Sequence, residues 1–233
     1  MIFLPGTDKQ SKILFKTLPE KFSSTLILGS GCEEIAKTMS EEYSSNVTII
    51  VDNYDSLLQS RLKLAGQKNI SVKMMDFSNT DFRGSSFDLA YAQASISNNN
   101  RNKIIKEIKR LLTPEGYFCN GEIVNLKDQA PAFVNDIWKA SNISPLNSTY
   151  LAGFYMDKGF VIILEEDISE SLKEFYSISS QLLKEKSGDL TEEEKSYYKK
   201  LLKQINHESN AYLKLGGDRY IGFKMLIMKK GQV

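Results

Sequence analysis

The chain of 233 residues contains two cysteines, one histidine and one tryptophan. Cys32 and Cys119 are far apart and belong to no CxxC pair, which disfavours a disulfide framework or a zinc cluster. No apolar run is long enough to cross a bilayer. The opening "MIFLPG" is too short for a signal-peptide core and has no basic stretch before it. We therefore expect a cytoplasmic protein with no membrane association and no bound metal.

The sequence also lacks an excess of either charge. Thirty Lys and Arg residues face 29 Asp and Glu residues, for a net charge of +1. This balance disfavours a nucleic acid as partner or substrate. There is no Pro/Gly/Ser-rich linker, so we expect residues 1–233 to form a single domain.

Strand and helix patterns alternate through the first half of the chain. This alternation predicts an α/β, Rossmann-like, three-layer sandwich with a mostly parallel sheet. "TPEG" at 113–116 predicts a turn before a strand. The expected strands cover 26–28, 46–52, 70–77, 86–93 and 117–125, and the expected helices cover 8–18, 33–43, 54–66 and 100–112.

The second half has a different pattern. Residues 130–157 are predicted to be mostly helical, and strands are expected at 159–167 and 219–230. Between these strands lies an expected helical insertion, about 168–217, of two helices. The second of these helices would begin with a capping box at Thr191 and Glu194. The insertion could be a lid over a substrate, a contact in a homodimer, or a structural cap.

Gly29, Ser30 and Gly31 follow the first expected strand and precede a helix. Such a turn exposes backbone N–H groups, and glycine lets a ligand approach the backbone closely. A dinucleotide-binding loop would place a small residue at position 34, where this chain has Glu34. A negative charge there would lie close to a pyrophosphate, so the loop argues against NAD.

Acidic residues follow the next two strands. Asp52 lies about twenty residues after the glycines, where an acid can accept both hydroxyls of a ribose; Asn53 or Asp55 could cap the next helix. Asp76 ends the third strand, and Phe77 follows it, where an apolar side chain can cover an adenine ring. Three successive strand ends thus carry glycines, then an acid, then a second acid. This combination is a more specific signal of a nucleoside-binding site than any one of the three features.

At this point the sequence resembles the class I S-adenosylmethionine-dependent methyltransferases. The resemblance rests on "LILGSG", Asp52, "MDF", "FDLAYAQ" and "LLTPEGYF", and on the ending "RYIGFKMLIMKK". It implies a seven-stranded sheet with an antiparallel last strand, and S-adenosylmethionine as cofactor. The cofactor-binding residues that it implies are Gly29, Ser30, Gly31, Asp52, Asn53, Asp76, Phe77, Ala92 and Gln93.

The chain departs from that family at the end of the site where the cofactor's methionine part would lie. Ile27 stands where the family often has an acid, and Glu33 replaces a third glycine. We expect Glu33 to be a solvated residue of the first helical turn. The alternative is that its carboxylate pairs with the amino group of the cofactor.

The expected activity is methyl transfer to a small-molecule acceptor. The same cofactor could instead donate its aminocarboxypropyl group, or the chain could be a cofactor-binding or interaction protein without turnover. No residue is universally required for methyl transfer, so the catalytic group is not assigned. Candidates for proton transfer are Glu122, Tyr91, Tyr155 and His207, of which His207 is expected on the solvated side of a helix.

Overall fold

The computed structural model describes residues 4–18, 21–43, 45–189 and 192–231. Seventeen elements are assigned within these ranges. In chain order they are α1 (Thr7–Thr17), β1 (Ser24–Leu28), α2 (Glu33–Glu41), β2 (Asn46–Val51), α3 (Tyr54–Lys63), β3 (Ile70–Met74), β4 (Phe87–Gln93), α4 (Arg101–Leu111), β5 (Leu112–Asn125), α5 (Ala132–Ala140), β6 (Leu146–Asn147), α6 (Leu151–Asp157), β7 (Phe160–Asp167), α7 (Glu170–Asp189), α8 (Glu192–Lys214), η1 (Gly217–Arg219) and β8 (Ile221–Lys230).

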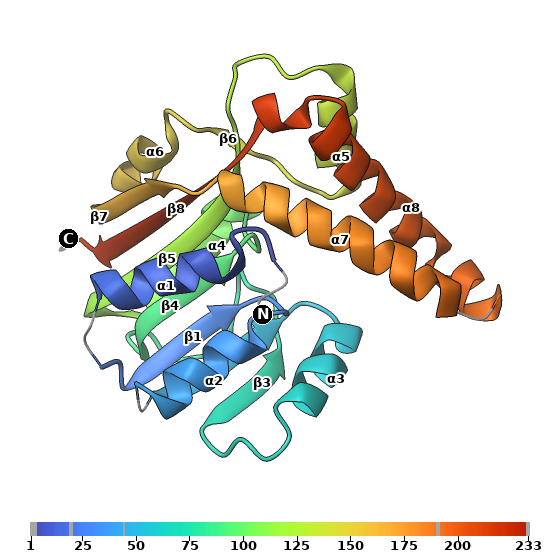
Figure 1. Ribbon diagram of the computed structural model, residues 1–233. Helices are drawn as coiled ribbons and strands as arrows, with labels where there is room; N and C mark the ends of the chain where they lie inside the picture. The colour runs from blue at the N-terminus through green and yellow to red at the C-terminus, as the bar shows by residue number, and fades with distance from the viewer. Residues whose placement is uncertain (1–3, 19–20, 44, 190–191, 232–233) are drawn as a thin grey trace.

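The strands form one mixed sheet in the order β3-β2-β1-β4-β5-β8-β7 (Figure 1). Strands β1 to β5 pair in parallel, whereas β8 is antiparallel to both β5 and β7. The two-residue β6 pairs with β5 outside this path. The predicted mostly parallel sheet with a reversed last strand is therefore confirmed, with β6 as an additional short strand.

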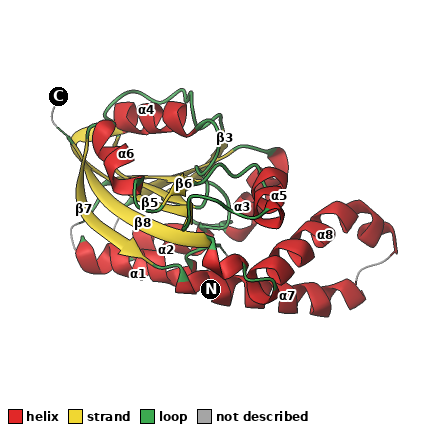
Figure 2. Ribbon diagram, turned by 90° about the horizontal axis from the view of Figure 1, so that it is seen from above, coloured by secondary structure: helices red, strands yellow, loops and turns green. Residues whose placement is uncertain are grey.

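Two hydrophobic clusters cover the two faces of the sheet, as expected for a three-layer sandwich. Alternate residues of β1 show the division, since Ile27 packs in one cluster and Leu26 and Leu28 in the other. The first cluster includes residues of α1, α2 and α3, and the second includes residues of α4 and α6. Figure 2 shows α4 and α6 on the opposite side of the sheet from α1 and α2.

One local prediction was wrong in detail, and another was confirmed. The "TPEG" segment is part of β5, but the pairing with β4 shifts there, because Phe87 is opposite Leu112 and Leu89 is opposite Tyr117. The turn residues thus form an irregularity within the strand rather than a separate loop. Residues 130–157 are mostly helical, as predicted, because they contain α5 and α6, and the short β6 lies between these helices.

The predicted insertion between β7 and β8 is a pair of long helices, α7 and α8. They pack on one another, and α8 also contacts α5. In Figure 1 their far ends extend away from the sheet. Thr191, the predicted first residue of the capping box, lies outside the described residues.

Candidate functional site

The carboxyl ends of β1, β2, β3 and β4 meet at one edge of the sheet because these strands are parallel. This is the edge at which α/β proteins bind ligands. Gly29 follows β1 in a left-handed conformation with φ 103°, and Gly31 has φ 87°. A Cβ atom on Gly29 would come within 2.9 Å of Ser95 Cβ. The loop therefore needs glycine at position 29 for its conformation and for the close approach of the segment after β4.

Glu33 is not solvated, and that prediction was wrong. The residue is only 4% exposed. Glu33 Oε1 accepts hydrogen bonds from the Gly31 N–H at 3.1 Å and from Ser60 Oγ at 2.6 Å, and Lys63 Nζ lies 3.4 Å from Oε2. Burial favours the neutral acid, but the hydrogen bonds from Ser60 and Gly31 and the charge of Lys63 outweigh it and lower the pKa of Glu33. The carboxylate thus fastens the glycine loop to α3.

These contacts also bear on which ligand the loop can hold. The Gly29 N–H donates to the Ile50 carbonyl at 2.9 Å, and the Gly31 N–H donates to Glu33. Two amides that a phosphate-binding loop would offer to its ligand are therefore engaged within the chain. The adjacent Glu34 is at the surface, where Lys37 Nζ lies 2.9 Å from its carboxylate. A buried carboxylate beside the loop disfavours a pyrophosphate and tolerates a cationic ligand.

One pocket, with a cavity volume of about 340 Å³, lies between the glycine loop and the inserted helices. Phe175 and Tyr176 of α7 and Glu208 of α8 form part of its wall. Of the described residues that line this pocket, only Asp52 and Glu208 are charged. The full lining comprises Leu4, Pro5, Gly29, Ser30, Asp52, Phe77, Gln93, Ala94, Ser95, Ile123, Ser141, Ile143, Phe175, Tyr176 and Glu208.

The N-terminal segment is a part of this pocket that the sequence did not predict. Leu4 and Pro5 line the pocket, and a Cβ on Gly31 would lie 3.2 Å from the Leu4 side chain. Gln93 fixes the segment, since its Nε2 donates to the carbonyls of Pro5 at 2.8 Å and Thr7 at 3.0 Å. The predicted cofactor residue Gln93 is thus both a lining residue and an anchor of the N-terminal segment.

A second pocket of about 520 Å³ adjoins the first. Asp52 and Phe77 line both pockets, whereas Asp76 lines only the second. Asn53 caps α3, since its Oδ1 accepts from the Ser56 N–H at 2.9 Å, and its Nδ2 donates to Asp52 Oδ1 at 2.8 Å. Asn53 therefore orients the Asp52 carboxylate at the junction of the pockets.

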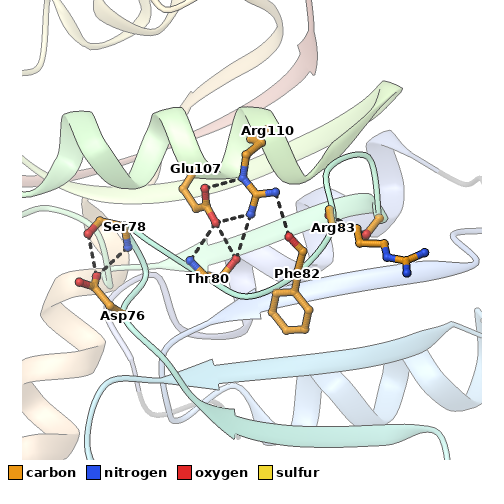
Figure 3. Close-up of polar contacts among 8 residues, drawn as sticks. Asp76, Ser78, Thr80, Phe82, Arg83, Glu107 and Arg110 are labelled. Atoms are coloured by element: carbon orange, nitrogen blue, oxygen red, sulfur yellow. Dashed lines mark hydrogen bonds and ion pairs between the residues drawn. The ribbon is translucent and has the colours of Figure 1, made fainter.

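Asp76 and Phe77 belong to a loop that is fixed to α4. The Ser78 N–H and Oγ both donate to Asp76 Oδ1 at 2.8 Å, and these hydrogen bonds lower the pKa of Asp76. Further along, Thr80 donates to the Glu107 carboxylate through its N–H and its hydroxyl (Figure 3). Arg110 pairs with the same carboxylate and donates to the Phe82 carbonyl at 2.9 Å. This Glu107–Arg110 clamp holds the loop from outside the pocket.

The predicted cofactor residue Ala92 and two catalytic candidates, Tyr91 and Tyr155, are completely buried. The Ala92 carbonyl accepts from Gln10 Nε2 at 2.9 Å, and Tyr91 donates to Gln93 Oε1 at 2.6 Å. Burial raises the pKa of both tyrosines well above its usual value. Among the described residues, those that line the two pockets do not include Ala92, Tyr91 or Tyr155.

Glu122 is also completely buried and its carboxylate has four protein partners. Arg101 Nε lies 2.8 Å from Oε2, where Ser97 Oγ also donates, while Asn120 and Tyr155 donate to Oε1. All of these partners come from the protein, so the carboxylate joins β5 to α4 and α6 within the core. The fourth candidate, His207, is exposed on α8, as predicted.

Ser95 has a buried hydroxyl with no hydrogen-bond partner among the described residues. It follows Ala94, whose φ of 57° is in the left-handed region. Both residues line the first pocket. An unsatisfied buried hydroxyl costs free energy, and a polar group in the pocket could remove this cost by a hydrogen bond to Ser95.

Among the described residues, no helix is both long and apolar enough to span a membrane. The same residues contain no cluster of three or more His, Cys, Asp or Glu side chains arranged to hold a metal ion.

The sequence matches one protein family, described as a methyltransferase domain, over residues 26–120. This range contains β1 to β4 and most of β5, with the glycine loop, Asp52 and Asp76. Comparison with curated proteins found no match.

Several solved structures have the same fold at low sequence identity. A proposed sarcosine dimethylglycine methyltransferase from Galdieria sulphuraria is 17% identical, with a TM-score of 0.76 over 96% of this chain and 84% of its own. The 4+2 cyclase SpnF is 17% identical, with a TM-score of 0.77 over 97% and 82%. Phosphoethanolamine N-methyltransferase 2 of Haemonchus contortus, in complex with S-adenosyl-L-methionine, is 16% identical, with a TM-score of 0.81 over 98% and 54%.

The similarity to these solved structures shows the fold of the chain. The family match identifies residues 26–120 as similar to a methyltransferase domain. The glycine loop, Asp52 and Asp76 lie within the matched range, whereas the reversed strand β8 lies outside it. Residues 26–120 therefore match a methyltransferase domain, and the chain has the fold of methyltransferases of known structure, one of them in complex with S-adenosyl-L-methionine.

Proposed function

We propose that this enzyme transfers the methyl group of S-adenosylmethionine to a small-molecule acceptor. The observation that carries the proposal is the pair of adjoining pockets that share Asp52 and Phe77. One pocket leads toward Asp76, and the other extends under α7 and α8. This arrangement offers one end for a nucleoside and another for the acceptor.

The residues present fit the cofactor. Asp52, held by Asn53, would accept hydrogen bonds from the ribose hydroxyls, and Phe77 would pack against the adenine near Asp76. The loop at Gly29, Ser30 and Gly31, with the unsatisfied hydroxyl of Ser95, would face the methionine part. Bound there, S-adenosylmethionine supplies an electrophilic methyl group on a sulfonium.

The chain's own contribution is alignment and exclusion of water. Leu4 and Pro5 cover the pocket beside the glycine loop, and Phe175 and Tyr176 cover it from α7. Positioning two reactants in such a site supplies much of the rate enhancement of a displacement reaction. We assign no general base, because the buried candidates lie away from the pocket lining.

A small acceptor suits the site better than a macromolecule. The first pocket has a volume of about 340 Å³, which is within the range of small-molecule sites. The near-neutral net charge gives no reason to propose a nucleic acid. Phe175, Tyr176 and Glu208 support a role of the inserted helices as a cover over this pocket.

Three further expectations remain part of the proposal. Residues 1–233 act as one domain, supported by the continuous sheet from β1 to β8. A cytoplasmic location is supported by two buried free cysteines, with burial raising the pKa of Cys119 to about 12. A homodimer could form through the parts of α7 and α8 that extend from the sheet in Figure 1.

The proposal is tested by the by-product of turnover. The protein is incubated with methyl-labelled S-adenosylmethionine and a panel of small amines, phenols, thiols and carboxylic acids. We expect label in one acceptor class and stoichiometric S-adenosylhomocysteine. Release of methylthioadenosine instead would show aminocarboxypropyl transfer, and label only in protein or RNA would refute the small-molecule assignment.

A further inference from the structure

The wall of the first pocket has a charge of one sign. Its charged members are the carboxylates of Asp52 and Glu208, and the described residues that line it include no Lys, Arg or His. Asp52 lies at the junction with the second pocket, whereas Glu208 lies on the inserted helix α8. An anionic acceptor would meet only like charge there.

The Glu208 carboxylate is held in place by its neighbours. Ser141 Oγ donates to Glu208 Oε1, and Gln204 Nε2 donates to the same oxygen at 3.0 Å. Gln204 also donates to Ser141 Oγ at 2.9 Å, which closes a three-residue network. Oε2 has no hydrogen-bond donor among the described residues. One oxygen is thus anchored, and the other is free to bind a ligand.

Aromatic rings adjoin this carboxylate. The Phe175 and Tyr176 rings are 5.1 Å apart at 64°, and Tyr176 stacks on Tyr212 with ring centroids 4.6 Å apart. Tyr176 is buried at 6% exposure, and burial, with the nearby Glu208 charge, raises its pKa. The tyrosine therefore stays neutral. A neutral aromatic surface beside a fixed carboxylate is the combination that binds organic ammonium groups.

We propose that Glu208, with Tyr176 and Phe175, forms a cation subsite that binds the ammonium group of an amine acceptor. The inference rests on the proposed function, because it assigns a substrate class to the acceptor end of that site. An ammonium ion would place its charge next to Glu208 Oε2 and its carbon substituents against the rings. Acceptors with a neutral or anionic head group would lack one or both of these interactions.

The test uses tetramethylammonium as the probe, titrated into protein saturated with S-adenosylhomocysteine at constant ionic strength. Tert-butanol is the neutral probe of similar shape, and acetate is the anionic one. Of the three probes, we expect only tetramethylammonium to show saturable binding. Its affinity should fall by about tenfold in Glu208→Gln. Glutamine keeps an oxygen for Ser141 and Gln204, so this variant should fold. The matched control is Glu174→Gln, an exposed acid on α7 next to Phe175.

The other outcomes are decisive. Equal binding of tetramethylammonium and tert-butanol, or equal loss in Glu208→Gln and Glu174→Gln, would overturn the cation subsite. Weaker S-adenosylhomocysteine binding in Glu208→Gln would assign this carboxylate to the cofactor and overturn it as well. Failure of the unmodified protein to bind S-adenosylhomocysteine would contradict the proposed function itself, which separates the two failures.

Discussion

The Glu107–Arg110 clamp gives a stability prediction that can be worked from the structure. Glu107 is 8% exposed and accepts hydrogen bonds from Arg110 and Thr80, which lower its pKa from 4.5 to about 2. That pKa difference of about 2.5 units corresponds to about 3.5 kcal/mol, at roughly 1.4 kcal/mol per unit. Arg110 is 42% exposed, so solvent screens the pair, and we expect Glu107→Gln to lose about 1.5–2 kcal/mol near neutral pH.

The pH dependence follows from the direction of the shift. The folded-state pKa lies below the unfolded one, so the contribution is complete above about pH 4.5 and is lost as the pH falls toward about 2. Urea unfolding of the unmodified protein and of Glu107→Gln would measure the difference near neutral pH and at about pH 3.5, where roughly three fifths should remain.

Asp81→Asn is the control for this measurement, because Asp81 is an exposed acid in the same loop. Its unfolding free energy should change little at either pH. A Glu107→Gln difference that is absent at neutral pH would refute the clamp. So would a difference that stays constant on acidification.

Two other side chains give direct tests. Glu33→Ala leaves the Gly31 N–H and the Ser60 hydroxyl without their acceptor, so we expect a loss of about 2–3 kcal/mol and a fall of roughly 4–12 °C in the thermal midpoint. The exposed Glu34→Gln should change the midpoint by less than about 2 °C, and equal effects of the two variants would contradict the buried role of Glu33. Gln93→Ala removes both hydrogen bonds that hold the N-terminal segment, so we expect faster proteolysis before α1 and weaker S-adenosylhomocysteine binding. Unchanged cleavage there would show that other contacts hold the segment.

The residues at the ligand-binding edge of the sheet were predictable from the sequence, because short local patterns mark where each strand ends. Apolar runs that end in Gly29, Asp52 or Asp76 place these residues at strand ends, and parallel strands bring such ends together. The irregularity in β5 was not predictable, because Pro114 and Gly116 have turn chemistry whether or not a sheet continues through them.

The remaining features depend on contacts between distant segments. Glu33 is buried by Ser60, which lies 27 positions away, and a first-turn glutamate carries no signal of that partner. The apolar start at Leu4 is too short for a periodic pattern, and Gln93 fixes it across 86 or more positions. The apolar and aromatic pattern of α7 and α8 predicted helices, but it did not indicate which pocket they cover.

The central claim is that the glycine loop, Asp52 and Phe77 hold S-adenosylmethionine rather than a dinucleotide. Calorimetry of S-adenosylhomocysteine and NAD with the unmodified protein, Asp52→Ala and the exposed control Asp55→Asn tests it most directly. We predict that the unmodified protein binds S-adenosylhomocysteine and does not bind NAD. The affinity for S-adenosylhomocysteine should fall by about tenfold or more in Asp52→Ala and stay unchanged in Asp55→Asn. Binding of NAD in its place, or S-adenosylhomocysteine binding that is indifferent to Asp52, would contradict the account.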